Sequence, residues 1–166
     1  MVNKKYHKWL LIALILIIGG GLFWSWRLIN SRRPAINMDE LSQDNLYHYR
    51  NDDLGFRLDL PAEFIYYQTQ RNNSADYSEI IFFVPTSDPD YIYEAFPSYA
   101  RPIIVRVYNE EAWNQLSEED ENKQEFEKKM VKTGRVYLLK FWENQPNDWQ
   151  DKWSDQMKEF IGQALK

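Results

Sequence analysis

The chain of 166 residues contains no cysteine and only two histidines, His7 and His48. Without cysteine it has no disulfide, no thiol nucleophile and no thiolate to bind a metal ion, so an exported domain would depend on packing for its stability. So few histidines exclude ordinary zinc sites and most histidine-dependent catalytic triads. The sequence therefore predicts no metal site, no cofactor and no conventional catalytic residue.

Glycine is also scarce. Three of the six glycines form the run 19–21, and the others are Gly55, Gly134 and Gly162. A phosphate-binding loop needs several closely spaced glycines before a helix, so nucleotide-binding loops of that kind are excluded. Aromatic residues reach 16% and no repeat or low-complexity tract occurs, which is typical of a globular protein.

Charge is unevenly distributed along the chain. Residues 1–33 contain six Lys and Arg and no acid, whereas residues 34–166 contain 14 Lys and Arg against 25 Asp and Glu, a net charge of −11. An acidic domain repels nucleic-acid phosphates, so we expect no nucleic-acid partner. It would also be repelled by an anionic membrane surface.

One uncharged stretch, residues 9–26, is the longest apolar run in the chain. As a helix it would be about 27 Å long, close to the hydrocarbon thickness of a bilayer. Tryptophans stand at both of its ends, and lysines and arginines flank it. The sequence predicts a transmembrane helix over 9–26, with a basic tail over 1–8 before it and a linker over 27–45 after it.

Two other interpretations of residues 9–26 were weighed. A cleaved signal peptide would need a small-x-small cleavage site, and Trp24, Trp26 and Arg27 occupy that place instead. A buried core helix would show a polar face, which this run lacks. A short basic tail stays in the cytoplasm easily, so we expect a single-pass protein in the cell membrane with residues 46–166 outside the cytoplasm.

Within residues 46–166, several short runs are rich in β-branched and aromatic residues. Residues 56–60 alternate strictly between apolar and polar, and residues 80–84 are apolar on both faces, which favours a covered central strand. The expected strands are 46–50, 56–60, 64–70, 78–84, 103–108 and 135–143.

Three helices are predicted late in the chain. Asn109 caps the first, which runs to Leu116, and the second starts at the capping signal of Ser117 and runs to Lys132, before Gly134. The third starts at Asp148 and carries one apolar stripe, formed by Trp149, Trp153, Met157, Phe160, Ile161 and Ala164. The expected fold class is α+β, an antiparallel sheet covered by helices.

The run from Leu54 to Pro61, Leu-Gly-Phe-Arg-Leu-Asp-Leu-Pro, preceded by Tyr49, resembles the opening hairpin of PsbP-like domains. The close of the chain, a strand at 136–139, a Pro/Asp loop and a terminal helix, is also similar to theirs. Over residues 46–166 the resemblance implies an α/β/α sandwich that serves as a binding or assembly module. No functional residue of the family can be carried over, and the segment Thr86–Pro102 has no counterpart.

The segment Thr86–Pro102 carries four aromatic residues, Tyr91, Tyr93, Phe96 and Tyr99. They are candidates for a surface that binds a partner or a glycan, although a satellite core packed on the sheet is the slightly favoured explanation. Our first hypothesis is a membrane-anchored, extracytoplasmic interaction module without catalytic activity, with a protein partner in the envelope and the bilayer as its lipid contact.

Acidic pairs support a second hypothesis, an envelope hydrolase or glycan binder. The candidates are Asp52–Asp53 and the pair Asp88 and Asp90, and the last two with Glu94 would also be candidates for a calcium site. All four aspartates lie in expected turns, where Asp is common for backbone reasons, and this explanation is favoured.

Overall fold

The structure is a computed structural model that describes residues 35–36, 41–91 and 96–166. The predicted tail 1–8, the membrane helix 9–26 and most of the linker 27–45 lie outside the described residues. Among the residues that are described, no helix is both long and apolar enough to cross a bilayer. The described part belongs to one compact unit that begins at Pro34.

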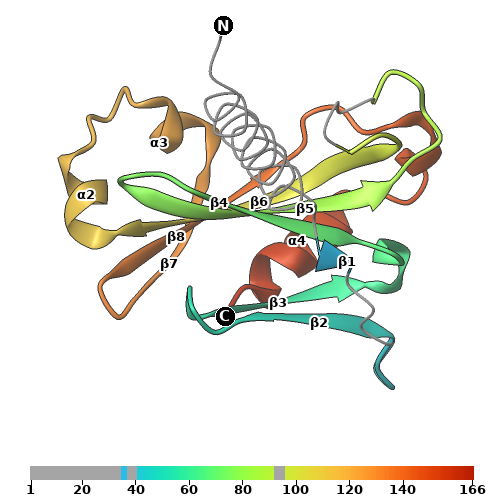
Figure 1. Ribbon diagram of the computed structural model, residues 1–166, viewed down its shortest axis with the longest axis horizontal. Helices are drawn as coiled ribbons and strands as arrows, with labels where there is room; N and C mark the ends of the chain where they lie inside the picture. Colours follow the sequence, from blue (N-terminus) through green and yellow to red (C-terminus); the bar gives the residue numbers. More distant parts are fainter. Residues whose placement is uncertain (1–34, 37–40, 92–95) are drawn as a thin grey trace, which may run out of the picture. The chain divides into compact units, whose positions relative to one another are not determined.

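Antiparallel pairing dominates this unit (Figure 1). The larger sheet has six strands in the order β1-β4-β5-β6-β8-β7, and a separate hairpin pairs β2 with β3. The six strands in that order are Ala35–Ile36, Gln68–Asn73, Tyr77–Pro85, Tyr99–Asn109, Arg135–Phe141 and Glu127–Lys132, and the hairpin strands are β2 (Leu46–Asn51) and β3 (Phe56–Pro61).

The hairpin follows directly from its sequence. The Asn51 side chain accepts from the backbone N–H of Leu54, and Gly55 closes the turn at a φ of 75°, which a glycine adopts without strain. The predicted alternation over 56–60 is confirmed, because Phe56 is buried while Arg57 faces solvent. The hairpin therefore offers one apolar face to the rest of the domain.

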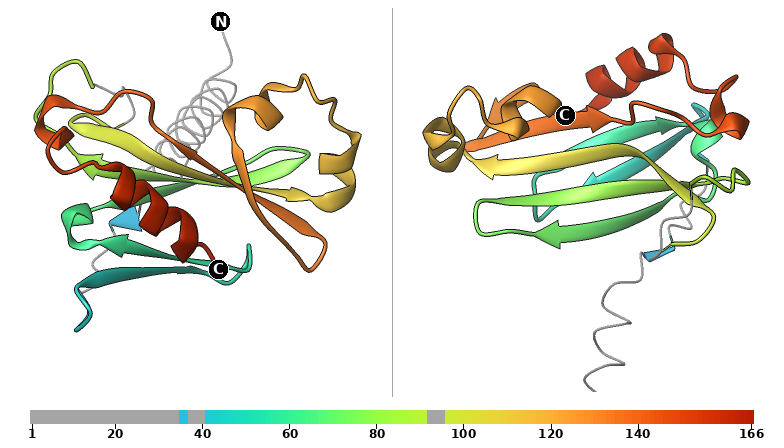
Figure 2. Two further views of the ribbon diagram at one scale, coloured as in Figure 1. Left: turned by 180° about the vertical axis from the view of Figure 1, so that it is seen from behind. Right: turned by 90° about the horizontal axis from the view of Figure 1, so that it is seen from above.

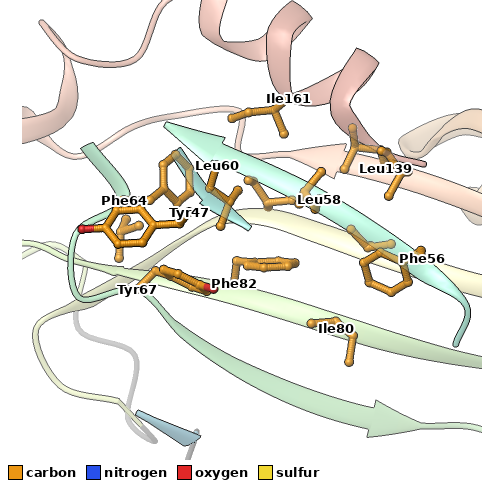
Figure 3. Close-up of a cluster of buried hydrophobic side chains, with 14 of the residues drawn as sticks. Tyr47, Phe56, Leu58, Leu60, Phe64, Tyr67, Ile80, Phe82, Leu139 and Ile161 are labelled. Atoms are coloured by element: carbon orange, nitrogen blue, oxygen red, sulfur yellow. The ribbon is translucent and has the colours of Figure 1, made fainter. Parts of the chain in front are cut away.

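That apolar face packs on one side of the six-stranded sheet together with α4 (Asp155–Ala164). Figure 3 shows Leu58 and Leu60 of β3 between Ile161 of α4 and Phe82 of β5. The 3-10 turn η1 (Ala62–Phe64) adds Phe64, which is fully buried. This side holds the main core.

On the opposite side of the sheet, the described residues form two smaller clusters, one at each end. At one end Trp113 of α2 (Glu110–Gln115) and Phe126, which follows α3 (Glu121–Glu125), pack on β6 and β8. At the other end Phe96 packs on Phe83. The Asn109 cap predicted for the first helix is confirmed, since its side chain accepts from the Glu111 N–H.

The predicted fold class, an α+β domain with helices covering the sheet as in an α/β/α sandwich, is wrong. The described residues form mostly antiparallel β-structure with few helices. The helix expected from Ser117 to Lys132 stops after Glu125, and the chain then forms β7. Thr133 and Gly134, both at positive φ, make a two-residue turn that returns β7 onto β8, so Gly134 is a hairpin residue and not a helix stop.

The last helix also starts later than predicted. Trp149 ends the short 3-10 turn η2 (Asn147–Trp149), and α4 begins only after Ser154, whose hydroxyl accepts from the Met157 N–H. Trp149 and Trp153 are buried as expected, but they precede the helix, and Phe160 is 39% exposed. The prediction of one stripe along a single helix is therefore wrong, because Trp149 and Trp153 lie outside α4. The prediction that Asp148 caps this helix is also wrong, because the Asp148 carboxylate binds Thr86 and Ser87 of another loop.

Candidate interaction surface

The structure places three of the four predicted aromatic residues, and Tyr93 lies outside the described residues. Phe96 is buried, with its ring centre 4.7 Å from that of Phe83. Tyr99 is half-buried, and its hydroxyl accepts from Gln68 at 2.6 Å. Tyr91 is half-buried and lines a groove, so of the described three it is the one that meets an open surface hollow.

This hollow, called the aromatic groove below, has a volume of about 310 Å³. It lies at the end of β8: Ile104 and Lys140 face each other on the side of the sheet opposite α4, whereas Tyr91, Phe141 and Trp142 pack against the main core. Its lining residues are Tyr91, Arg101, Ile104, Lys140, Phe141 and Trp142.

Hydrogen bonds hold the walls of the aromatic groove in place. The Tyr91 hydroxyl donates to the Asn144 carbonyl at 2.7 Å, and the Trp142 backbone N–H donates to the Pro102 carbonyl at 3.1 Å. The Trp142 ring packs edge-on against Trp153 at 5.1 Å. Burial, with the nearby aspartates, raises the pKa of the Tyr91 hydroxyl, so it stays a neutral donor.

Two cations stand beside these aromatic rings. Arg101 is exposed, and the Lys140 ammonium forms an ion pair with Glu125. Lys140 also lies 5.7 Å from the Phe126 ring centre, within cation–π distance. The aromatic groove thus combines apolar walls with positive charge on a domain that is acidic as a whole.

A larger hollow of about 410 Å³ lies where the turns at one end of the sheet meet. Two arginines line it, and both are bound to Asp53: the Arg71 guanidinium forms an ion pair with the Asp53 carboxylate at 3.0 Å, and Arg135 donates to the Asp53 carbonyl at 2.9 Å. Its polar groups therefore hold the turn of the β2–β3 hairpin, and size alone does not make it a functional site.

Hydrogen bonds and ion pairs with neighbouring groups account for the described candidate aspartates and for Asp148. Asp148 accepts from the Thr86 hydroxyl at 2.6 Å and from the Ser87 N–H at 3.0 Å, while Asp88 accepts from the Asn147 N–H at 2.8 Å. Each loop thus binds the other through one carboxylate. Burial raises the pKa of Asp148, but these hydrogen bonds outweigh burial and lower it overall.

The remaining acids follow the same pattern. Asp52 pairs with Arg50, and Asp90 donates its backbone N–H to Asp88. Glu94 lies outside the described residues. Within the part of the chain that the structure describes, no three His, Cys, Asp or Glu side chains gather closely enough to hold a metal ion.

His48 lies on the exposed face of β2. Its Nδ1 is 2.7 Å from the Asp59 carboxylate and its Nε2 is 3.3 Å from that of Asp44. The hydrogen bond to Asp59, opposed by burial and assisted by the charge of Asp44, raises the pKa of His48. Both partners are acceptors, so they favour the protonated ring, and both ring nitrogens face a carboxylate in place of a nucleophile.

The His48 pKa gives a pH-dependent contribution to stability. Because this pKa is higher in the folded than in the unfolded chain, the contribution is complete below the ordinary histidine pKa and is lost as the pH rises through the folded value. We expect Asp59→Asn to lower the His48 pKa in an NMR titration. Since the pair is half exposed, the matching loss of stability at pH 6 should not exceed about 1 kcal/mol. Asp151→Asn is the control, and an unchanged His48 pKa in Asp59→Asn would contradict the assignment.

Sequence reasoning missed one buried polar pair on the side of the sheet opposite α4. Arg106 of β6 forms an ion pair with Glu79 of β5 at 2.7 Å, and its guanidinium lies 4.2 Å from the ring centres of both Tyr77 and Phe126. Asn122 also accepts from Arg106. The signal was one charged residue beside or within a largely apolar run of each strand, Glu79 before residues 80–84 and Arg106 within residues 103–107.

No protein-family model, curated protein or solved structure matches this chain. The resemblance to PsbP-like domains stays a prediction from short motifs, and the roles of the residues rest on their geometry.

Proposed function

We propose that this protein is a single-pass, membrane-anchored, extracytoplasmic interaction module without catalytic activity, and that the aromatic groove contacts a protein partner in the envelope. The apolar, basic-flanked segment 9–26 supports the anchor, and the short basic tail before it supports a cytoplasmic N-terminus. Both are inferences from the sequence.

The composition of the aromatic groove carries the proposal. Protein interfaces are enriched in tyrosine, tryptophan and arginine, and Tyr91, Trp142 and Arg101 meet in this hollow. Its rigid walls would lose little conformational entropy when a partner binds.

A glycan is the second candidate ligand, because the rings of Tyr91 and Trp142 offer flat apolar surfaces in one hollow. Glycoside hydrolysis is less well supported. It requires two carboxyl groups that flank the scissile bond, and among the described residues no Asp or Glu lines the aromatic groove.

Photo-crosslinking in intact cells tests the proposed function. A benzophenone amino acid at Tyr91 of the full-length chain is expected to give a discrete crosslinked product, and protease added to spheroplasts should release it from the membrane. The control position is Glu159 on α4, which is exposed and does not line the groove.

Three results would contradict the proposal. Equal crosslinking from Tyr91 and Glu159 would show that the groove is not a specific surface. Protection of the domain until the cells are lysed would reverse the orientation. A crosslinked product that only glycosidase digestion removes would identify the glycan as the ligand.

A further inference from the structure

The edge strand β7 is a second surface, separate from the aromatic groove. Among the described residues its only strand neighbour is β8, and the two-residue turn that joins them projects from the domain (Figures 1 and 2). An edge strand presents unpaired backbone N–H and C=O groups to one side. The free edge of β7 is therefore able to pair with an added strand.

The register shows which backbone groups are free. The Glu110 N–H donates to the Gly134 carbonyl at 3.0 Å, so the backbone N–H and C=O of Gly134 point toward β6. Those of Arg135, the next residue, therefore point toward β7. Lys132 pairs with Arg135 across the turn, and backbone groups alternate in direction along a strand. The N–H and C=O of Val131 therefore face away from the sheet.

The side chains beside this free edge are also accessible. Val131 is 46% exposed, and Lys128 and Lys132 are exposed as well. Neither lysine has an ion-pair partner among the described residues, whereas Lys129 pairs with Glu127 at 2.6 Å. A strand laid along β7 would meet Val131 and Lys128 on one face of the sheet and Lys132 on the other.

The charge of this hairpin is opposite to that of the rest of the domain. Residues 127–141 contain five Lys and Arg and one acid, a net charge of +4, while the rest of residues 34–166 has a net charge of −15. Edge lysines also prevent indiscriminate strand pairing, and two copies of β7 would repel each other. The same charges attract a strand that carries carboxylates, so they select among strands and do not exclude all of them.

We propose that β7 binds an extended, acidic segment of a partner protein as an added β-strand. Backbone hydrogen bonds to Val131 supply affinity, and Lys128 and Lys132 supply selectivity for carboxylates. This inference rests on the proposed role as an interaction module, but it uses a different surface from the aromatic groove.

Peptide binding to the full-length chain in detergent tests this inference. The probe is a fluorescent eight-residue peptide of alternating valine and glutamate, and fluorescence anisotropy reports its affinity. Two control peptides carry lysine in place of glutamate, or N-methyl groups on alternate backbone nitrogens. We expect the acidic peptide to bind and both control peptides to bind at least tenfold more weakly.

Four variants of the protein separate charge from backbone pairing. Lys132→Glu should weaken binding about fivefold or more, and Lys152→Glu, the same charge change outside the hairpin, should not. Val131→Pro removes the backbone N–H of residue 131, which faces away from β8. No hydrogen bond within the sheet is lost, so the edge strand should still form. It should weaken binding about tenfold, and Val131→Ala, which keeps the N–H, should bind more tightly than Val131→Pro.

Several outcomes would overturn the inference. They are no binding of the acidic peptide to the unmodified chain, equal binding of the N-methylated peptide, and equal binding by Val131→Pro. Either of the last two results would show that the peptide binds by charge attraction alone. An anionic membrane surface would attract the lysines of β7 in the same way. If Tyr91 crosslinks persist while the acidic peptide does not bind, only this inference fails. If the peptide binds and the crosslinks are absent, the proposed use of the groove fails.

Discussion

Replacing Trp153 by alanine is expected to lower the free energy of unfolding by about 3–5 kcal/mol, a large part of the stability of a small domain. Trp153 is 5% exposed, and its ring centre lies 5.6 Å from Phe141 and 5.1 Å from Trp142. Its indole N–H has no hydrogen-bond partner among the described residues, so the loss is one of packing. Trp153→Phe, which keeps most of the aromatic surface, should therefore cost less.

Urea denaturation of the full-length chain measures this effect. Lys152→Ala is the matched control, because Lys152 is the preceding residue and is exposed, and surface changes of this kind are usually within about 0.5 kcal/mol. If Trp153→Ala and Lys152→Ala unfold at the same urea concentration, the tryptophan is not part of the core.

The second large effect is expected at the buried pair of Glu79 and Arg106. The two side chains are only 11% and 14% exposed, so removing either charge leaves the other buried without its partner. Glu79→Leu and Arg106→Met should each lower the free energy of unfolding by about 3–5 kcal/mol. The double variant should recover most of that loss, because an apolar pair carries no desolvation penalty.

A double-mutant cycle by urea denaturation measures this coupling. Lys158→Met, which breaks the exposed pair with Asp155, is the control and should change stability by less than about 0.5 kcal/mol. Additive losses in the double variant would show that Glu79 and Arg106 do not act as a pair.

The second predicted helix shows why local pattern was insufficient. Acids at its start and lysines toward its end suit a helix dipole, and the helix does begin after Asp120, which accepts from the Asn122 N–H. The same lysines also suit an edge strand, and the sequence contains both signals. Pairing of Val131 with Val136 across the Thr133–Gly134 turn decides between them, and that contact is not local to the helix pattern.

The candidate sites were predictable to different degrees. Tyr91 was proposed from its aromatic segment, but the groove also needs Arg101, Ile104, Lys140 and Trp142, which β6 and β8 bring together. Phe96 came from the same segment and is buried. Sequence composition marks a side chain as apolar, and only the packing of the sheet decides whether it is covered.

By itself, the sequence determined the β2–β3 hairpin, the covered strand β5 and the turn positions of its aspartates, because alternation and turn chemistry act over a few residues. Only the tertiary structure decided that Asp88 and Asp148 hold two loops together, that Arg106 lies between two rings, and that residues 127–132 form an open basic edge. The first two features join residues that are distant in the chain, and the third depends on which strands the sheet leaves at its edge. Their energies depend on burial and pairing in three dimensions, which no local pattern contains.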